Sequence, residues 1–366
     1  MISVRALVLT PDFPPAPGGI QLLAHRLVSR LEGVSCRVLT LEGSDTATWD
    51  ATQELDVRRV SVALDRRLGI VRLNAAALAE ARRWRPDVVI AMHIVNAPGA
   101  AAVRRATGAP VVTYVYAAEV PASRRLARFA LRSSDRIVAI SRYTAELATS
   151  NGAEAARVRI IPPGVDWRDR LERTRFATPT VVTVARLEDR YKGHDVMTRA
   201  MPLIRSRVPT AQWVVIGEGP LRHDIQRLAA SHGIGDAIRL LGPVSDEERD
   251  RWLDRAHVFA MPSRVPANGG AGEGFGIVYL EAGVHGLPVV AGNVGGALDA
   301  VVDGTTGLLV DPTDHVQVAD AISRLLLDRN EAARMGEAGK EHARNFAWPE
   351  IAGRVQEVIA ETVAQA

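Results

Sequence analysis

The chain has 366 residues, of which 47% are hydrophobic and 24% charged, and its formal net charge is +3. This length favours two domains, and the composition is that of a globular protein. The small net charge, without any nucleic-acid-binding signature, argues against a nucleic-acid partner. Cys36 is the only cysteine, so an internal disulfide is excluded and a reducing cytoplasm is expected. No apolar run approaches the roughly 18 residues that a membrane span needs.

Short β-branched runs alternate with longer helical patterns through most of the chain, which is typical of parallel α/β layers. In the first half the predicted strands are Val4–Thr10, Cys36–Leu41, Asp87–His93, Pro110–Tyr116 and Arg136–Ile140. Predicted helices between them include Ile20–Leu31, Val71–Trp84 and Ala122–Arg132. In the second half the predicted strands are Thr180–Ala185, Trp213–Gly217, Ile238–Leu241, His257–Met261 and Pro288–Ala291.

The polar, arginine-rich segment Trp167–Pro179 separates the two series and has no apolar periodicity, so it is the predicted linker. We therefore expect two doubly wound domains, residues 1–167 and 168–347. Ligands of such folds collect at the carboxyl ends of the strands, so the expected site is a cleft between the domains. After Phe346 the pattern predicts one more helix, Pro349–Ala364, with no strand behind it. The pattern does not decide which domain this helix joins.

The first predicted strand is followed by a proline-rich loop, Asp12 to Ile20, that ends in Gly18-Gly19 at a predicted helix start. Glycines at this place let the backbone approach a phosphate or a sugar. The loop lacks the third glycine of a dinucleotide-binding fingerprint. A ligand contact and an ordinary strand-to-helix turn are both compatible with it.

Two loops of the second half carry features suited to a diphosphate. The stretch Arg186 to Lys192 follows the first strand of this half, and its cations could neutralise phosphate oxygens. Gly217 ends the next strand in the same layer and is followed by Glu218-Gly219. Each stretch alone could be an ordinary charged surface loop. Together they favour a ligand site at one edge of the sheet, where both strands end.

The segment Pro262 to Gly296 contains two glutamates, Glu273 and Glu281, around a Gly-Phe-Gly turn. A short helix is predicted from Ile277 to His285, and the unpaired N–H groups of its first turn suit a phosphate. Glu273 would lie in the loop and Glu281 slightly more than a turn inside the helix. They would hold opposite ends of one extended ligand, such as a nucleotide sugar. The alternative is two solvated carboxylates, with Glu281 complementing the helix dipole.

This combination resembles the retaining GT-B glycosyltransferases of family 4, over essentially the whole chain. The matching pieces are Gly18-Gly19, Ile161 to Asp166, Ala185-Arg186-Leu187 with Lys192-Gly193, Gly217-Glu218-Gly219, Glu273 with Glu281, Gly286 to Gly296, and Gly304 to Pro312. Residues Pro288 to Gly296 look most like the phosphatidylinositol mannosyltransferase branch. The resemblance implies two Rossmann-like domains facing a cleft. The N-terminal domain would bind the acceptor, the C-terminal domain the donor, and a last helix, 348–366, would cross back to the N-terminal domain.

The resemblance also implies a reaction. A sugar would pass from a nucleoside diphosphate sugar, with a GDP- or UDP-sugar favoured, to an acceptor, without a cofactor or an essential metal. Arg186 and Lys192 would hold the diphosphate, Glu273 the hydroxyl groups of the sugar, and Glu281 the ribose. The remaining donor-binding residues would be Gly18, Gly19, Gly217, Phe275, Gly276 and Ile277.

One turn departs from the family pattern. Family members usually have a histidine in a His-Gly-x-Glu turn, where this chain reads Tyr116-Ala117-Ala118-Glu119. Tyrosine can donate a hydrogen bond to a sugar hydroxyl, but its usual pKa of about 10 makes it a poor base. In a front-face mechanism the leaving phosphate can take the acceptor proton, so Tyr116 is compatible with transfer.

Other candidates for the acceptor side lie nearby in the predicted topology. His93 ends the strand before this turn and could supply an imidazole, although a strand-end histidine often has no such role. The acceptor candidates are His93, Asn96, Glu119 and Arg264, and both Arg264 and Asn268 are candidate contacts for either the donor or the acceptor. The acceptor itself is expected to be a specialised small molecule or natural-product scaffold, or else a lipid or polysaccharide intermediate.

Several alternatives stay open. The basic amphipathic segment Arg124 to Arg132 fits a solvated surface or a contact with anionic lipid. The expected location is therefore the cytoplasm, with or without peripheral contact at the inner face of the membrane, and the oligomeric state is not predicted. A nucleotide-sugar 2-epimerase on the same fold is a second function, and a non-catalytic nucleotide-sugar-binding subunit is a third.

Overall fold

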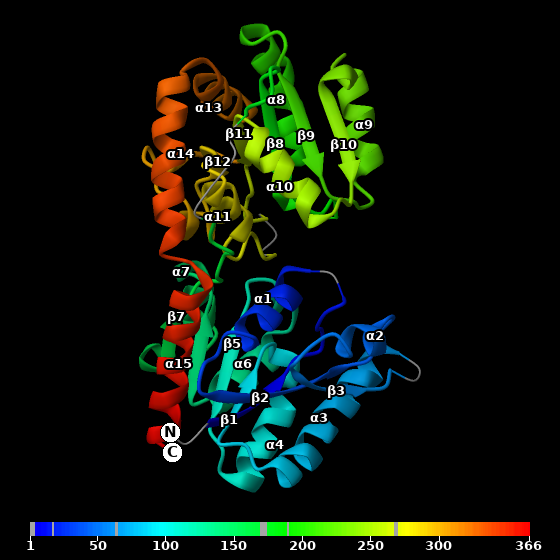
Figure 1. The fold of residues 1–366 in the computed structure, drawn as a ribbon, viewed down its shortest axis with the longest axis vertical. Coiled ribbons are helices and arrows are strands. Elements are labelled where there is room, and N and C mark those ends of the chain that lie inside the picture. Colours follow the sequence, from blue (N-terminus) through cyan, green and yellow to red (C-terminus); the bar gives the residue numbers. More distant parts are fainter. Residues whose placement is uncertain (1–3, 17, 63–64, 169–173, 189, 267–269) are drawn as a thin grey trace. The chain divides into compact units, whose positions relative to one another are not determined.

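The computed structural model describes residues 4–16, 18–62, 65–168, 174–188, 190–266 and 270–366. The chain divides into two compact units, of which unit 1 is Met1–Gly164 with Trp348–Ala366 and unit 2 is Val165–Ala347. Each unit contains one parallel sheet with helices on both faces (Figure 1). The predicted α/β class with two doubly wound sheets is confirmed.

In unit 1 the strand order is β3-β2-β1-β4-β5-β6-β7. The strands are β1 (Val4–Leu9), β2 (Val34–Leu41), β3 (Asp56–Val60), β4 (Val88–Ala91), β5 (Val111–Val115), β6 (Arg136–Ala139) and β7 (Val158–Ile160). The central ones are nearly continuous apolar runs because both faces of a parallel sheet are covered. The chain order reverses between β1 and β4, so the carboxyl ends of these two strands flank the point where ligands of this topology bind.

The helices of unit 1 are α1 (Gly19–Val28), α2 (Thr46–Asp50), α3 (Arg66–Trp84), α4 (Ala97–Thr107), α5 (Glu119–Ala122), α6 (Arg124–Ser133), α7 (Arg142–Ser150) and α15 (Trp348–Ala364). Short 3₁₀ turns cover Ile94–Asn96 and Ala155–Arg157. The last helix, α15, packs against α1, β4 and β5. The chain's final helix therefore belongs to unit 1, as the resemblance implies.

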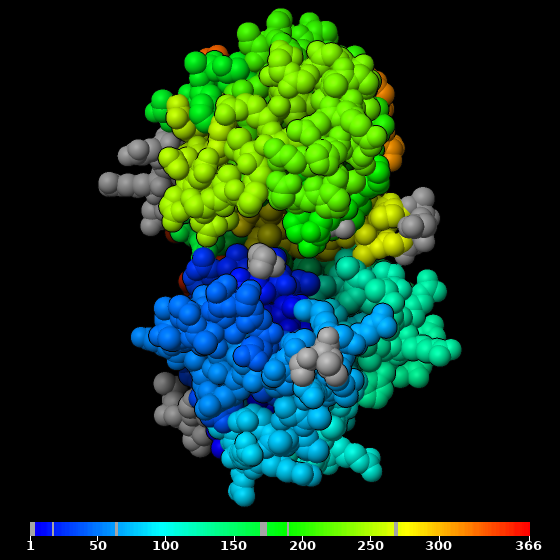
Figure 2. Space-filling model, turned by 90° about the vertical axis from the view of Figure 1, so that its right-hand side faces the viewer, coloured from blue at the N-terminus to red at the C-terminus, as the bar shows by residue number. Residues whose placement is uncertain are grey.

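Helices α3, α4 and α6 pack side by side and form the sky-blue to teal part of the surface in Figure 2. Their outward positions are rich in arginine. The exposed arginines are Arg66, Arg67, Arg72, Arg82, Arg83, Arg104, Arg105, Arg124, Arg125, Arg128 and Arg132. Phe129 of α6 is exposed among them. This face of unit 1 is strongly basic even though the whole chain is nearly neutral.

In unit 2 the strand order is β10-β9-β8-β11-β12-β13, with the reversal between β8 and β11. The strands are β8 (Thr180–Val184), β9 (Gln212–Ile216), β10 (Ile238–Gly242), β11 (Val258–Met261), β12 (Val289–Gly292) and β13 (Gly307–Val310). The helices are α8 (His194–Arg207), α9 (Arg222–Ser231), α10 (Asp246–Arg255), α11 (Ile277–Val284), α12 (Ala297–Ala300), α13 (His315–Leu327) and α14 (Arg329–Arg344). Short 3₁₀ turns cover Arg190–Lys192 and Gly235–Ala237.

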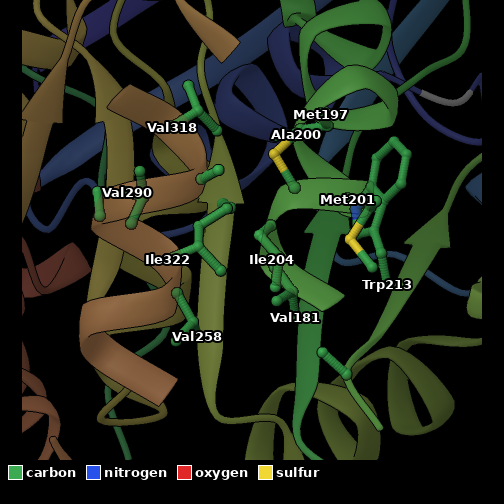
Figure 3. Packing of buried hydrophobic residues seen from close by; sticks show 14 of the residues in the cluster. Val181, Met197, Ala200, Met201, Ile204, Trp213, Val258, Val290, Val318 and Ile322 are labelled. Carbon is green, nitrogen blue, oxygen red and sulfur yellow. The ribbon is translucent and has the colours of Figure 1, made fainter. Parts of the chain in front are cut away.

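The core of unit 2 forms where α8 and α13 pack together on one face of the sheet (Figure 3). Trp213 is fully buried there, and its indole N–H donates to Thr183 Oγ1 at 2.9 Å. Burying each large apolar side chain contributes about 1.5–3 kcal/mol. This packing fixes β8 relative to α8, and the loop between them carries Arg186 and Lys192.

Three strands were not predicted: β3, β7 and β13. Each of them lies at the edge of its sheet. An edge strand is covered less completely and tolerates charged residues, so in β3 and β7 arginines interrupt the apolar run on which the prediction depended, whereas β13 is a short apolar run of four residues that begins with a glycine. Helix α3 also begins earlier than predicted, because Asp65 caps it by accepting hydrogen bonds from the N–H groups of Arg67 and Leu68.

Candidate active site

The candidate site of unit 2 lies at the carboxyl ends of β8 and β11. The loop after β8 ends at Gly193, where α8 begins, and the loop after β11 leads to α11. Gly193 has a φ of +80°, and a Cβ atom there would lie 2.3 Å from the carbonyl oxygen of Pro262. The two loops therefore meet backbone against backbone, at a position where only glycine fits.

An ion pair joins the same two loops. Lys192 Nζ lies 2.5 Å from Glu273 Oε2, and the two side chains are only 14% and 12% exposed. The ammonium group also lies 5.0 Å from the centre of the Tyr191 ring. Two residues that are 81 positions apart, both predicted from the sequence as site residues, are thus brought together.

The loop that carries Glu273 packs against Gly296, and the close contact is between Gly296 and Gly274. Gly296 N–H donates to the Glu273 carbonyl at 2.9 Å. A Cβ atom on Gly296 would lie 2.2 Å from the Gly274 carbonyl oxygen. A side chain at this position would therefore push the Glu273 loop out of place.

Helix α11 starts directly after this loop. Its N-cap residue, Gly276, has a φ of +83° and offers no side-chain cap to the first turn. Tyr279 fixes the helix to the end of β11, because its hydroxyl bonds the Met261 carbonyl at 2.8 Å and Ser263 Oγ at 2.7 Å. The N–H groups of an uncapped helix start, beside a lysine, form a suitable place for a phosphate.

Glu281 lies in the second turn of α11 and is partly buried. Burial raises the pKa of its carboxyl group, while the charges of Arg249 and His285 act against this shift. His285 itself bonds Asp254 at 2.7 Å. No sequence motif singles out Arg249, since α10 precedes β11 and carries no motif of the site.

The other predicted donor residues occupy neighbouring strand ends. Arg186 follows β8, is 64% exposed, and pairs with Glu188 at 3.2 Å. Gly217 follows β9 with a φ of +140°. Phe275 is buried against Phe346, with ring centres 5.9 Å apart. Gly276 and Ile277 form the start of α11.

Arg264 reaches α8. Its guanidinium donates to Asp195 Oδ1 at 2.9 Å, and its backbone N–H donates to the Tyr191 carbonyl at 2.8 Å. Burial alone would raise the pKa of Asp195, but the hydrogen bond and the charge of Arg264 hold it below its usual value. Asp195 was not among the predicted site residues. Asn268, the other candidate in this loop, lies outside the described residues.

In unit 1, Glu119 organises the carboxyl ends of β4 and β5. This buried carboxylate accepts hydrogen bonds from Tyr116 N–H at 2.9 Å and Ile94 N–H at 3.1 Å. His93 Nδ1 lies 2.9 Å from Glu119 Oε2. Burial lowers the pKa of His93, but the charge and the hydrogen bond of Glu119 outweigh burial, and the net result is a raised pKa.

Two further predicted residues have buried polar atoms. The Tyr116 hydroxyl and both side-chain polar atoms of Asn96 have no hydrogen-bond partner among the described residues. Burial raises the pKa of Tyr116 well above 10, so its hydroxyl stays protonated at neutral pH. Gly18 and Gly19 lie at the start of α1, and a Cβ atom on Gly19 would meet no neighbour within 4 Å.

The described part of the chain contains no candidate metal centre and no candidate membrane span. No group of three or more His, Cys, Asp or Glu side chains is arranged to hold a metal ion. No helix there has both the length and the apolar character needed to cross a membrane.

Family models match both halves of the chain. The model described as "Glycosyltransferase Family 4" matches residues 17–168, and "Glycosyl transferases group 1" matches residues 172–342. The chain is 34% identical over 383 residues to the GDP-mannose-dependent alpha-(1-6)-phosphatidylinositol monomannoside mannosyltransferase of Mycobacterium tuberculosis, covering 97% of this chain and 98% of the relative. It is 34% identical over 258 residues to the D-inositol 3-phosphate glycosyltransferase of Salinispora tropica, covering 63% and 52%.

Solved structures have the same fold at lower identity. Anabaena HepE in complex with UDP matches with a TM-score of 0.82 and 20% identity, covering 98% of this chain and all of the other. The sucrose-phosphate synthase of Thermosynechococcus elongatus matches with a TM-score of 0.81 and 20% identity, covering 99% and 100%. The predicted GT-B architecture is thereby confirmed.

Proposed function

Because this chain belongs to the group 1 glycosyltransferases of family 4, we propose that it transfers a sugar from a nucleoside diphosphate sugar to an acceptor hydroxyl with retention of configuration. The observation that carries this proposal is the Lys192–Glu273 ion pair at the reversal point of the unit 2 sheet. It lies beside the uncapped start of α11. A lysine, a carboxylate and free helix N–H groups together match the phosphate and sugar ends of one donor.

The diphosphate is the part of the donor for which support is strongest. Lys192 and the first turn of α11 supply positive charge to the departing phosphate, which stabilises the charge that develops there. Arg186 lies in the same loop as Lys192, after β8, and is exposed enough to exchange Glu188 for a phosphate oxygen. The guanidinium fork would then add a second charge-assisted bond.

The sugar and the ribose lie on either side of the diphosphate in this proposal. Glu273 accepts hydrogen bonds from sugar hydroxyls, next to the amides of Phe275, Gly276 and Ile277. Glu281, one turn into α11, accepts from the ribose hydroxyls. Gly217 borders the donor from β9.

The reaction proceeds on one face of the sugar. The bond from the anomeric carbon to the leaving phosphate oxygen breaks, and a bond from the same carbon to the acceptor oxygen forms on the same side. The acceptor proton passes to the leaving phosphate. The protein contributes positioning and electrostatic stabilisation, so a tyrosine at position 116 is compatible with turnover because no base is required there.

The donor proposed first is GDP-mannose, because the mycobacterial relative that matches nearly the whole chain is named for it. The acceptor proposed first is a lipid-linked or free polyol, since two relatives are named for inositol-containing molecules. The arginine-rich face of α3, α4 and α6 supports peripheral contact with an anionic membrane surface.

A donor panel tests this function. GDP-mannose, UDP-glucose, ADP-glucose and dTDP-glucose are compared by thermal shift and calorimetry, and the product's anomeric configuration is read by NMR. Glu273→Gln, Lys192→Ala and Arg186→Ala are expected to lose most turnover while remaining folded. Arg190→Ala is the matched control, because Arg190 lies in the same loop but pairs with Asp224 at 2.9 Å.

Two results would overturn the proposal. If none of the four donors stabilises the protein, the site in unit 2 has been misread. If the product has the inverted configuration, the front-face displacement is wrong even though the donor site is right.

A further inference from the structure

A groove in unit 2 lies outside the donor site proposed above. Helices α8 and α9 pack side by side, and the groove between them has a volume of about 500 Å³. Three arginines, two aspartates and a histidine line it, together with the apolar side chains Leu221, Ile225 and Leu228. The volume is in the range of small-ligand sites, and a mixture of charged and apolar walls is typical of them.

His194 forms part of the floor of this groove. The residue is 2% exposed, and neither of its ring nitrogens has a hydrogen-bond partner among the described residues. Burial, with the charge of Lys192 in addition, lowers its pKa to about 4, so the neutral ring has one N–H donor and one acceptor. Buried polar groups are nearly always hydrogen-bonded. Two unused ring nitrogens therefore indicate that a polar group of a ligand completes this groove.

Asp195, on the α8 side of the groove, is shared by two arginines. Arg199 of α8 donates to Oδ2 at 2.8 Å, and Arg264 donates to Oδ1 at 2.9 Å. The Arg199 side chain is 41% exposed, and it uses one terminal nitrogen in this bond. Exposed ion pairs contribute little to stability, so a ligand can take Arg199 at small cost. Arg264 then keeps Asp195 paired.

Asp224, on the α9 side, is shared in the same way. Arg190 donates to it at 2.9 Å and Arg227 at 2.5 Å, and the Arg227 side chain is 80% exposed. One arginine from each helix, Arg199 and Arg227, can therefore turn to a ligand while both carboxylates stay paired. Four guanidinium groups against two carboxylates also leave an excess of positive charge, which favours an anion.

We propose that this groove is a second anion site of the protein, which binds a small molecule that carries a phosphate monoester. Arg199 and Arg227 bond the phosphate oxygens from α8 and α9, and His194 bonds a hydroxyl group or an oxygen of the same molecule. Guanidinium forks suit a phosphate, which offers three acceptor oxygens. The groove is larger than a free phosphate needs, and its apolar wall suits the carbon skeleton of the ligand.

The bound phosphate acts on the donor through the turn that joins the two sites. Lys192 lies two residues before His194, and its charge acts on that ring. A phosphate dianion beside His194 lowers the positive potential at Lys192, so the diphosphate of a donor binds less tightly. The effect is reciprocal, because two linked binding equilibria change each other by the same factor. This effector role rests on the proposed function, whereas the phosphate monoester site does not.

Calorimetry on the full chain tests the site with three probes, inorganic phosphate, mannose 6-phosphate and AMP. The sugar phosphate or the nucleotide should bind at least about tenfold more tightly than inorganic phosphate, and the tighter of the two assigns the class of ligand. The double variant Arg199→Met/Arg227→Met should weaken this binding at least about tenfold. Arg205→Met is the matched control, because Arg205 lies on the same helix α8 and pairs with Asp236 at 2.9 Å.

Further measurements separate the groove from the donor site. Arg186→Ala alters the donor site and should leave the affinity for the probe unchanged. In NMR of histidine-labelled protein, the His194 signal should shift on adding the probe, and His194→Gln identifies that signal by its loss. A saturating probe should raise the Kd of the donor about fivefold at low ionic strength, and this effect should shrink as salt is added.

Several results would overturn the inference. No binding of any probe by the wild type excludes the site, and so does an unchanged affinity in Arg199→Met/Arg227→Met. Loss of probe binding in Arg186→Ala would assign the anion to the donor site instead. If the double variant does not fold, a His194 signal that the probe leaves in place also excludes the groove. A donor Kd that the probe does not change excludes the effector role, and a wild type that binds the probe but no nucleotide sugar overturns the proposed function alone.

Discussion

Lys192→Met is the sharpest test of the donor site, because it removes one ammonium group and keeps most of the side-chain volume. In the wild type, Nζ lies 2.5 Å from Glu273 Oε2, and both side chains are less than 15% exposed. Breaking a buried ion pair by removing one partner costs about 3–5 kcal/mol. Because this pair is still partly exposed, we expect Lys192→Met to lower the free energy of unfolding by about 2 kcal/mol.

The expected effects on stability and on activity differ in size. For a domain as large as unit 2, about 1 kcal/mol shifts Tm by about 2–4 °C, so Lys192→Met should lower the Tm of this unit by about 4–8 °C. Activity should fall further, because the role proposed for the ammonium is to stabilise the leaving phosphate. Removing one such preorganised group typically costs about 10²–10³-fold in kcat. Calorimetry and an assay of released nucleoside diphosphate measure the two effects separately.

A second replacement separates these effects. Glu273→Gln in the Lys192→Met background removes the carboxylate that has lost its partner, so Tm should recover by at least half. Turnover should not recover, because neither the cation nor the carboxylate has been restored. Arg190→Met, in the same loop, should leave both nearly unchanged. Wild-type kcat in Lys192→Met, or recovery of kcat in the double variant, would refute the assignment of Lys192 to the diphosphate.

Three further predictions concern single positions. Gly193→Ala should lower the Tm of unit 2 by several degrees, because its Cβ would lie 2.3 Å from the Pro262 carbonyl; Gly233→Ala, which has a φ of +67° and no neighbour within 4 Å, is the control in a thermal shift assay. Gly296→Ala should weaken donor binding, measured by calorimetry, at least tenfold, since its Cβ would lie 2.2 Å from the Gly274 carbonyl oxygen. Gly353→Ala is the control, because its Cβ would meet no neighbour within 4 Å, and equal donor affinity in the two variants would contradict this prediction. His93→Gln should reduce stability toward urea at pH 5.5 more than at pH 8.5. The folded-state pKa of His93 is raised, so its contribution is complete below the unfolded value of about 6.5 and is lost as pH rises through the folded value. Equal losses at both pH values would argue against the Glu119 contact.

Much of the donor site was predictable because its residues follow strands. Lys192 and Glu273 come after buried apolar runs, and the carboxyl ends of parallel strands lie along one edge of a sheet. That the two loops touch was not predictable, because it depends on β8 and β11 being neighbours, which chain order does not reveal. The Gly193 contact with Pro262 has the same origin.

The acceptor side was less predictable for a different reason. Glu119 acts through bonds to the backbone N–H groups of Tyr116 and Ile94, and backbone groups leave no trace in the residue pattern. Arg59 belongs to the edge strand β3, whose charged residues conceal it from a search for apolar runs. The pocket lined by Asp12, Arg59 and Arg66 is therefore built from the parts of unit 1 whose sequence is least regular.

The two reversal points differ in how their polar groups are satisfied, and this difference bears on where selectivity arises. In unit 2, Lys192 and Glu273 already pair, so a diphosphate oxygen that replaces Glu273 on Lys192 exchanges one charge-assisted bond for another, and the released carboxylate would accept from the sugar hydroxyls. In unit 1, the Tyr116 hydroxyl and the Asn96 amide are buried and have no hydrogen-bond partner among the described residues, which costs about 1–3 kcal/mol for each such group. A ligand hydroxyl that reaches them recovers this cost, and an analogue without that hydroxyl does not. Sites with buried unpaired polar groups discriminate strongly against ligands that lack the matching group. We therefore expect this enzyme to tolerate changes in its donor more readily than the loss of a single hydroxyl from its acceptor.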